Sequence, residues 1–316
     1  MTMKPFGELT PRVDALEIID SHIKPIEGIE KIPIGESNGR VLAEDVVAGF
    51  DVPPFPRASM DGYAVKAKDT SGATEEKPVI LKLIGIQHTG GVFEGTVNDG
   101  ECLEIATGAP MPNGADAVMM VEYTKKDGEK VYIEREIKSS KNMAEAGADM
   151  EKGTHVLSPG NTITPGVIGA LAALGYIEVE VYMKPTVAIY SSGPEIASQG
   201  QALKPGQIYD INSYTLATVI EANGGIPVVR GIVEDTVESI REALSSASEH
   251  DLWVVSGGSS VGTKDLFSEV MEEMGTIHFH GVKTKPGKPT LFGEVDGTSM
   301  FGMPGYPTSC INNSYV

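Results

Sequence analysis

The sequence is short of cysteine and of long apolar runs, and each shortage excludes a class of protein. Its two cysteines, Cys102 and Cys310, lie far apart and have no CxxC neighbour, so neither a disulfide framework nor a zinc knuckle is supported. No apolar stretch approaches the ~20 residues that span a bilayer, and the N-terminus lacks the apolar region of a signal peptide. We therefore expect a cytoplasmic protein with no membrane contact.

Positive charge is also scarce. The chain has 25 Lys and Arg residues against 44 Asp and Glu residues, which gives a formal net charge of −19. Most of such a surface repels a nucleic-acid backbone, so we expect no nucleic-acid partner. A small phosphorylated ligand remains admissible, because salt screens charges beyond about 8 Å and a few clustered lysines can dominate their own loop.

Glycine and proline, in contrast, are plentiful. The chain of 316 residues is 41% hydrophobic and has 37 glycines and 20 prolines, which is typical of a globular protein rich in tight turns. Single cores stop growing at roughly 250–300 residues, so the length predicts two or more domains.

The last third of the chain alternates between strand and helix patterns. Such alternation predicts right-handed crossovers and a doubly wound, mainly parallel sheet, and ligands bind such sheets at the carboxyl ends of the strands. We expect strands at 186–190, 226–229, 252–255 and 277–279 and helices at 212–222, 236–248 and 265–274.

The first half has a different pattern. Short β-prone runs at 79–86, 117–122 and 130–137, separated by glycine turns, predict a small, mainly β domain. Short strands are expected at 31–34 and 40–43, and a helix at 165–174 that Gly175 ends. Near the N-terminus we expect an amphipathic helix capped by Thr10, with this apolar face: Val13, Leu16, Ile19 and Ile23.

A loop rich in glycine and serine follows the strand at 252–255. It reads Ser-Gly-Gly-Ser-Ser-Val-Gly-Thr-Lys-Asp from Ser256 to Asp265, and Lys285 and Lys288 stand in the proline-stiffened segment Lys283–Pro289. Backbone N–H groups of such a loop hold phosphate, and ammonium groups neutralise it. The alternative is a solvated run of charge.

Acidic residues follow the predicted strands. Glu195, Asp235 and Asp265 each come after a different strand, so the fold brings three carboxylates to one edge of the sheet, where Mg²⁺ needs only one or two of them plus phosphate oxygens and water. Asp235 and Asp265 could instead only cap the helices that follow. His278 and His280 alternate on a short strand and, without a third ligand, are interpreted as edge-strand residues rather than metal ligands.

Two proline-fixed loops, around Asp61 and Thr107, either pack a domain junction or present side chains to a site, and the residues alone do not choose between these roles. Further motifs accompany these loops from about residue 5 to the end of the chain: Pro54–Val65, Thr107–Asp116, Pro205–Asn212, Ser256–Asp265, Lys285–Pro289 and Met303–Pro307. Together and in this order, the motifs resemble the MoeA/gephyrin E-domain family, the molybdopterin molybdenumtransferases.

The resemblance implies a cytosolic homodimer that binds adenylylated molybdopterin, which is a pterin nucleotide, and molybdate. With Mg²⁺ or a similar cation, it would cleave off AMP and release the molybdenum cofactor. It implies catalytic roles for Asp61, Glu195 and Asp265 and metal binding by Asp235, Asp265 and Glu195. A MogA-like adenylyltransferase is a candidate partner. The expected substrate-binding residues are Thr107, Asp149, Ser192, Gly193, Gly257, Gly258, Ser259, Ser260, Gly262, Lys285, Lys288, Pro304 and Gly305.

The expected domain plan combines the pattern with the resemblance. A MogA-like α/β pterin-binding domain spans 181–316 with the helix of 1–26 packed on it; a connecting mixed domain combines 27–47 with 143–180; and a small β domain spans 48–142. The family's usual C-terminal β domain is expected to be absent. The chain departs from the family pattern at Pro194, Leu266 and Tyr306.

Two other functions remain as alternatives to the transferase. A molybdopterin adenylyltransferase would resemble the last third alone, and the motifs around Asp61 and Thr107 speak against it. A pterin-binding scaffold without turnover is the third hypothesis. The sequence does not distinguish molybdate from tungstate, because both are tetrahedral dianions of similar size.

Overall fold

The computed structural model describes residues 9–257 and 266–315. It divides the chain into two compact units: an α/β unit of residues 1–30 and 182–316, and a β-rich unit of residues 31–181. None of the described helices is long and apolar enough to cross a membrane. Both units have their own apolar cores, as the length of the chain predicts.

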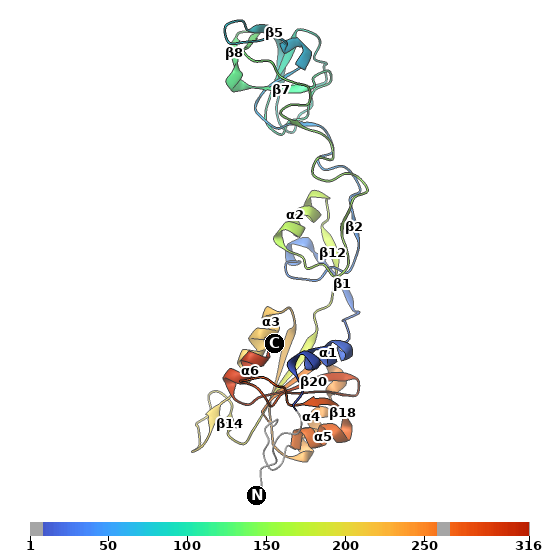
Figure 1. Ribbon diagram of the computed structural model, residues 1–316, viewed down its shortest axis with the longest axis vertical. Coiled ribbons are helices and arrows are strands. Elements are labelled where there is room, and N and C mark those ends of the chain that lie inside the picture. Colours follow the sequence, from blue (N-terminus) through green and yellow to red (C-terminus); the bar gives the residue numbers. More distant parts are fainter. Residues whose placement is uncertain (1–8, 258–265, 316) are drawn as a thin grey trace. The chain divides into compact units, whose positions relative to one another are not determined.

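A six-stranded mixed sheet forms the centre of the α/β unit (Figure 1). Four neighbouring strands are parallel, and β19 runs antiparallel to both β20 and β18, so the predicted doubly wound, mainly parallel sheet is confirmed. Its strands, in spatial order, are β16 Ile226–Val233, β13 Thr186–Ser192, β17 Leu252–Ser256, β20 Thr298–Met303, β19 Leu291–Val295 and β18 Gly275–His280.

Helices cover both faces of this sheet, because alternate strand residues point to opposite sides. In β13, Val187 and Ile189 pack towards α3 and α6, whereas Ala188 and Tyr190 pack towards α4 and α5. Figure 1 shows α1 on the same face as α3 and α6. The helices are α1 Arg12–His22, α3 Asn212–Ala222, α4 Val237–Leu244, α5 Leu266–Met274 and α6 Pro307–Asn313, and a two-stranded excursion pairs β14 Ile196–Ala197 with β15 Ile208–Tyr209.

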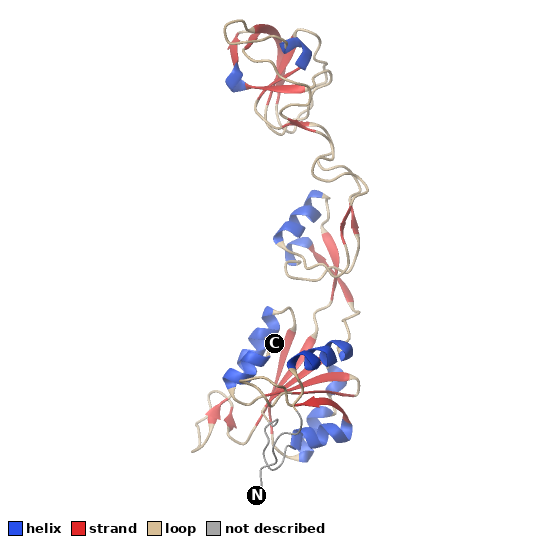
Figure 2. Cartoon of the chain, viewed as in Figure 1, coloured by secondary structure: helices blue, strands red, loops and turns tan. Residues whose placement is uncertain are grey.

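The β-rich unit contains a second six-stranded sheet, which carries almost no helix in Figure 2. Tyr63 and Val65 in β4 face one apolar core and Ala64 faces the other, which is the alternation expected of a sheet covered on both sides. In spatial order its strands are β7 Ala117–Met120, β4 Gly62–Val65, β6 Glu101–Ile105, β5 Val79–Gln87, β9 Lys130–Ile133 and β8 Thr124–Asp127.

A further core in the same unit joins residues from both ends of its sequence. Leu42 and Val46 pack there with Ile163 and Leu171. The helix α2, Pro165–Ala173, begins where Thr164 accepts a hydrogen bond from the Val167 N–H. The remaining elements are the pairs β1 Ile29–Pro33 with β12 Glu178–Tyr182, β2 Val46–Val47 with β11 His155–Leu157, and β3 Arg57–Ala58 with β10 Met143–Ala144, and the short helices η1 Ile34–Glu36, η2 Ala67–Thr70, η3 Val121–Tyr123 and η4 Ala247–Glu249. The division of residues 31–181 into a connecting domain and a small β domain stays a prediction.

The predicted cap of the first helix is wrong. Thr10 is extended and forms a β-bridge with Val282, in which its N–H donates to the Gly281 carbonyl and its carbonyl accepts from the Lys283 N–H. Pro11 stands at the cap position instead, with no side-chain hydrogen bond. The backbone pairing with Val282 therefore determines the conformation of Thr10, and the local capping pattern does not.

The predicted apolar face of α1 is also wrong in part. Val13 is 65% exposed and Ile23 is 42% exposed, while Ala15, Ile18 and Ile19 pack against aromatic residues of the sheet. The expected strand at 40–43 is reduced to isolated bridges. The elements expected at 117–122, 130–137 and 236–248 are shorter than predicted.

Candidate functional site

The carboxyl ends of four parallel strands form one edge of the α/β unit. Ser192 pairs with Val233 across β13 and β16, and Ser256 pairs with Met303 across β17 and β20. The residues that follow these strands therefore emerge side by side. They are Gly193–Glu195 after β13, Glu234 and Asp235 after β16, Gly257 after β17, and Pro304 and Gly305 after β20.

Backbone segments approach one another closely at the centre of this edge. A Cβ atom on Gly257 would lie 2.1 Å from the Ser192 carbonyl oxygen, and Gly257 has φ of +87°. The Gly257 N–H donates to the Met303 carbonyl at 3.1 Å, and a Cβ on Gly305 would lie 3.5 Å from the Gly257 Cα. The first glycine of the loop is therefore required by space and by conformation.

Acidic residues lie on one side of this centre. Gly193, Pro194, Glu234 and Asp235 line a hollow of about 380 Å³ at the ends of β13 and β16. The exposed Glu195 carboxylate lies over Gly193, where an added Cβ would meet its oxygens at 2.7 and 2.8 Å. The structure thus brings Glu195 and Asp235 to one edge, as the sequence predicts.

The structural alternative for Asp235, a helix cap, does not hold. The N-cap of α4 is Thr236, whose hydroxyl oxygen accepts a hydrogen bond from the Ser239 N–H at 3.2 Å. Asp235 is exposed beside it. Its carboxylate is therefore not used to begin the helix.

Lysines lie on the other side of the same edge. The loop between β18 and β19 is at this edge, because Leu291 at the start of β19 pairs with Gly302 near the end of β20. This loop carries the exposed Lys285 and Lys288, which form no ion pair with any described residue. Its backbone is held where the Asn313 side-chain amide donates to the Gly287 carbonyl at 2.8 Å.

Buried hydroxyl groups form the floor beneath the strand ends. The Ser191 hydroxyl lies 2.9 Å from that of Ser213 and 3.1 Å from that of Ser256. The Ser213 N–H donates to the buried carboxylate of Asp210 at 3.1 Å. These contacts fix the start of α3 against the ends of β13 and β17.

A separate pair of predicted residues meets in the β-rich unit. The N–H and hydroxyl of Thr107 donate to one Asp61 oxygen at 2.7 and 2.9 Å. The backbone bond, and then the hydroxyl bond, hold the pKa of Asp61 below its ordinary value, so this exposed carboxylate stays ionised. Asp61 lines a hollow of about 240 Å³ together with Gln87 and His88.

Asp149 forms an ion pair with Arg57. The Arg57 Nη2 and Asp149 Oδ2 atoms lie 3.2 Å apart, and both side chains are about half exposed. Among the described residues, no hydrogen bond or ion pair joins Asp149 to Asp61 or Thr107. An ion pair of this exposure contributes little stability, with ~0–1 kcal/mol as the common range.

Part of the predicted site lies outside the described residues: Gly258, Ser259, Ser260, Gly262 and Asp265. Within residues 9–257 and 266–315, no group of three or more His, Cys, Asp or Glu side chains is placed to hold a metal ion. His278 lies on the edge strand β18 and contacts His22, with ring centroids 3.7 Å apart and the rings tilted by 39°.

The exposed carboxylates at the hollow nevertheless fit Mg²⁺. This ion keeps several waters and takes one or two protein carboxylates plus phosphate oxygens. Asp235 lines the hollow and Glu195 lies over the neighbouring Gly193, so this edge carries carboxylates in that number.

Two further residues at this edge were given no role from the sequence. Glu234 lines the same hollow as Asp235, and Asn212 bonds the Gly305 carbonyl through its side-chain amide at 2.9 Å. Like Asp235, Glu234 follows a predicted strand. Asn212 stands in a quoted motif, but no local signal separates it from an ordinary helix start. Among the departures, Pro194 lines the hollow, Leu266 begins α5 and Tyr306 precedes α6.

Comparison with known proteins covers both units. The family model described as MoeA N-terminal region (domain I and II) matches residues 10–175, and the model of a probable molybdopterin binding domain matches residues 188–314.

The chain is also similar to named relatives and to a solved structure over most of its length. It is 33% identical to the molybdopterin molybdenumtransferase of Nostoc sp. over 98% of this chain and 74% of the relative. It is 37% identical to molybdopterin molybdenumtransferase 2 of Mycobacterium tuberculosis over 89% of this chain and 71% of the relative. The crystal structure of the molybdopterin biosynthesis MoeA protein from Pyrococcus horikoshii OT3 matches with a TM-score of 0.84 and 35% identity, over 96% of this chain and 76% of that one. The chain therefore belongs to the MoeA family of molybdopterin molybdenumtransferases.

Proposed function

We propose that this chain inserts molybdenum from molybdate into adenylylated molybdopterin and releases AMP. One observation carries the proposal: the carboxyl edge of the parallel sheet has acidic residues on one side of Gly257 and, on the other, exposed lysines that form no ion pair with a described residue. A pyrophosphate-linked nucleotide needs both, because its own negative charge must be neutralised while a separate group acts at the scissile bond.

Each group then has a role. Lys285 and Lys288 neutralise the pyrophosphate, and the backbone around Gly257 lets it approach the strand ends. Glu195 orients molybdate or the attacking water. Asp61, held ionised by Thr107, is the carboxylate of the β-rich unit to which we assign a catalytic role.

Mg²⁺ is part of this proposal. Asp235 and Glu195 would hold it together with phosphate oxygens and water, and Asp265 is the further candidate ligand from the sequence. When bound, the ion supplies polarisation of a phosphate oxygen. Glu234, in the same hollow as Asp235, adds negative charge that favours a divalent cation over a monovalent one.

Family membership supports three further parts of the proposal: a homodimer, action in the cytosol, and a MogA-like adenylyltransferase as the supplier of substrate. Tungstate is proposed as a possible replacement for molybdate, since the two anions have the same shape and charge.

The test is AMP release from adenylylated molybdopterin in the presence of Mg²⁺, with and without molybdate. We expect release that depends on molybdate. Binding without release would favour the scaffold, and formation of adenylylated molybdopterin from ATP would favour the adenylyltransferase; either result would overturn the proposal.

A further inference from the structure

Asn212, the first residue of α3, is buried and only half satisfied. It is 6% exposed, and its amide nitrogen donates to the Gly305 carbonyl at 2.9 Å. Its side-chain oxygen is also buried and has no hydrogen-bond partner among the described residues. An unsatisfied buried polar atom in a native protein calls for an explanation. The bond to Gly305 is thus the one hydrogen bond that the Asn212 side chain makes to a described residue.

The bond to Gly305 fixes the direction of a whole peptide unit. The Gly305–Tyr306 peptide is trans, since the cis bonds among the described residues are Val52–Pro53 and Lys285–Pro286, and in a trans peptide the N–H points opposite to the C=O. Because the carbonyl points to Asn212, the Tyr306 N–H points away from α3. This N–H donates to no described group, and both residues of the peptide are exposed.

Asn212 is itself held firmly. The next residue, Ser213, is 1% exposed and is bonded through its N–H to Asp210 and through its hydroxyl to Ser191. The start of α3 therefore cannot shift relative to the end of β13 without breaking buried hydrogen bonds. A rigid support of this kind holds the Asn212 amide donor in a fixed orientation.

We propose that Asn212 is a positioning residue that aims the Tyr306 N–H at a phosphate oxygen of the substrate's pyrophosphate linkage. The inference rests on the proposed function for the identity of the substrate and extends it by assigning one donor and the residue that orients it. A backbone N–H that is already oriented donates to an anionic oxygen without further ordering. Asn212 acts through the peptide and does not touch the ligand.

The first experiment measures binding of inorganic pyrophosphate by calorimetry. Asn212→Asp keeps the size of the side chain but cannot donate to the Gly305 carbonyl. We expect its affinity for pyrophosphate to fall about tenfold, which corresponds to ~1.4 kcal/mol, and KM for adenylylated molybdopterin to rise more than kcat falls. The matched control is Asn223→Ala, at the other end of the same helix, where the amide likewise donates to a carbonyl, that of Val219, at 2.8 Å. We expect it to bind pyrophosphate like the wild type.

The second experiment uses the wild-type protein, so its result does not depend on whether an Asn212 variant folds. In wild-type protein labelled with ¹⁵N-tyrosine, the Tyr306 amide resonance, assigned with Tyr306→Phe, should shift when pyrophosphate is added. A Tyr306 resonance that stays in place while pyrophosphate binds, or no binding up to millimolar pyrophosphate, would overturn the inference. Equal affinity of wild type and Asn212→Asp would do the same.

The two proposals fail separately. If the Tyr306 amide responds but molybdate does not promote AMP release, the proposed function is wrong and the phosphate donor stands. If AMP is released but the amide does not respond, the inference is wrong and the function stands.

Discussion

Replacing Gly257 by alanine tests whether the strand ends are packed as closely as the structure places them. The new Cβ would lie 2.1 Å from the Ser192 carbonyl oxygen and 3.2 Å from the carbonyl carbon. Backbone atoms at the ends of paired strands cannot move aside as a flexible side chain can. The ends of β13 and β17 must therefore separate, or Gly257 must leave its conformation.

Comparison with a matched control, Gly224→Ala, gives the expected loss in the free energy of unfolding. Gly224 has the same φ of +87°, but a Cβ there meets nothing within 4 Å. Gly224→Ala should therefore cost only the left-handed backbone term, about 1–2 kcal/mol. Gly257→Ala adds an overpacking term of about 1–3 kcal/mol and should cost about 2–5 kcal/mol in all.

The chain offers a probe confined to the relevant unit. Its single tryptophan, Trp253, is 1% exposed on β17 and stacks on Tyr190, with centroids 4.6 Å apart. Urea unfolding followed by Trp253 fluorescence thus reports the free energy of unfolding of the α/β unit. In a thermal scan the shift should be about 2–4 °C for each kcal/mol. Equal costs for Gly257→Ala and Gly224→Ala would refute the close approach.

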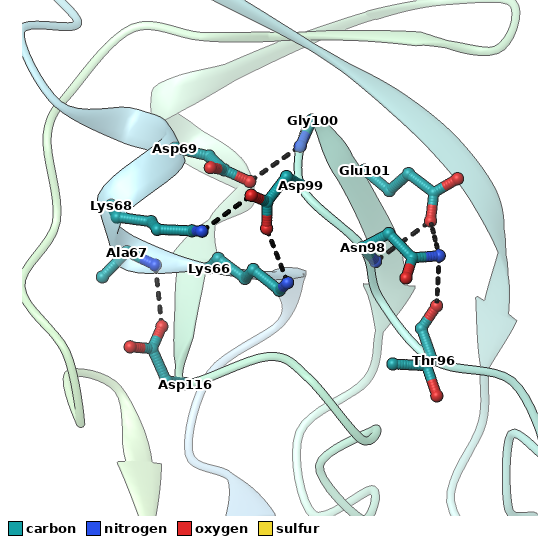
Figure 3. Close-up of polar contacts among 10 residues, drawn as sticks. All are labelled: Lys66, Ala67, Lys68, Asp69, Thr96, Asn98, Asp99, Gly100, Glu101 and Asp116. Carbon is teal, nitrogen blue, oxygen red and sulfur yellow. Dashed lines mark hydrogen bonds and ion pairs between the residues drawn. The ribbon is translucent and has the colours of Figure 1, made fainter.

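Three further outcomes follow from the charges. Lys66 and Lys68 each donate to the Asp99 carboxylate at 2.7 Å (Figure 3) and lower the pKa of Asp99 to about 2. The ionised Asp99 therefore stabilises the protein above pH 3.8, and this stabilisation is lost as the pH falls towards 2. In acid unfolding, the difference in free energy of unfolding between wild type and Asp99→Asn should close over that pH range. Burial lowers the pKa of His278 below 6.5, so the unfolded chain binds more protons than the folded one and stability should fall as the pH drops below 6.5. In thermal unfolding, His278→Phe should make the melting temperature less dependent on pH in this range. Lys285→Ala should weaken pyrophosphate binding and make its calorimetric affinity less dependent on salt; an unchanged salt dependence would remove this lysine from the site.

Local patterns predicted the α/β unit well. The helix expected at 212–222 has those bounds in α3, and the strand expected at 252–255 extends by one residue in β17. These elements follow from hydrophobic period and from glycine at the helix end, which act over a few residues. The order of strand and helix then fixed which residues emerge at the carboxyl edge, so Glu195 and Asp235 were predicted together.

Features that depend on distant partners were not predictable in this way. Thr10 carries every local mark of a helix cap, but its backbone pairs with Val282. Asn212 looks like any polar helix start, and only the fold brings Gly305 within 2.9 Å of it. The site roles of Thr107 and Asp61 rested on resemblance, and their hydrogen bond was not predicted, because nothing local to either loop indicates the other.

The central claim is that the acidic side of the carboxyl edge carries out molybdate-dependent turnover. It is tested most directly by measuring AMP release from adenylylated molybdopterin, with molybdate and Mg²⁺, for wild type, Glu195→Gln and the control Glu221→Gln, an exposed residue of α3. We predict full release by wild type and by the control, and loss of release by Glu195→Gln with pyrophosphate binding retained. Release by Glu195→Gln at the wild-type rate would contradict the account.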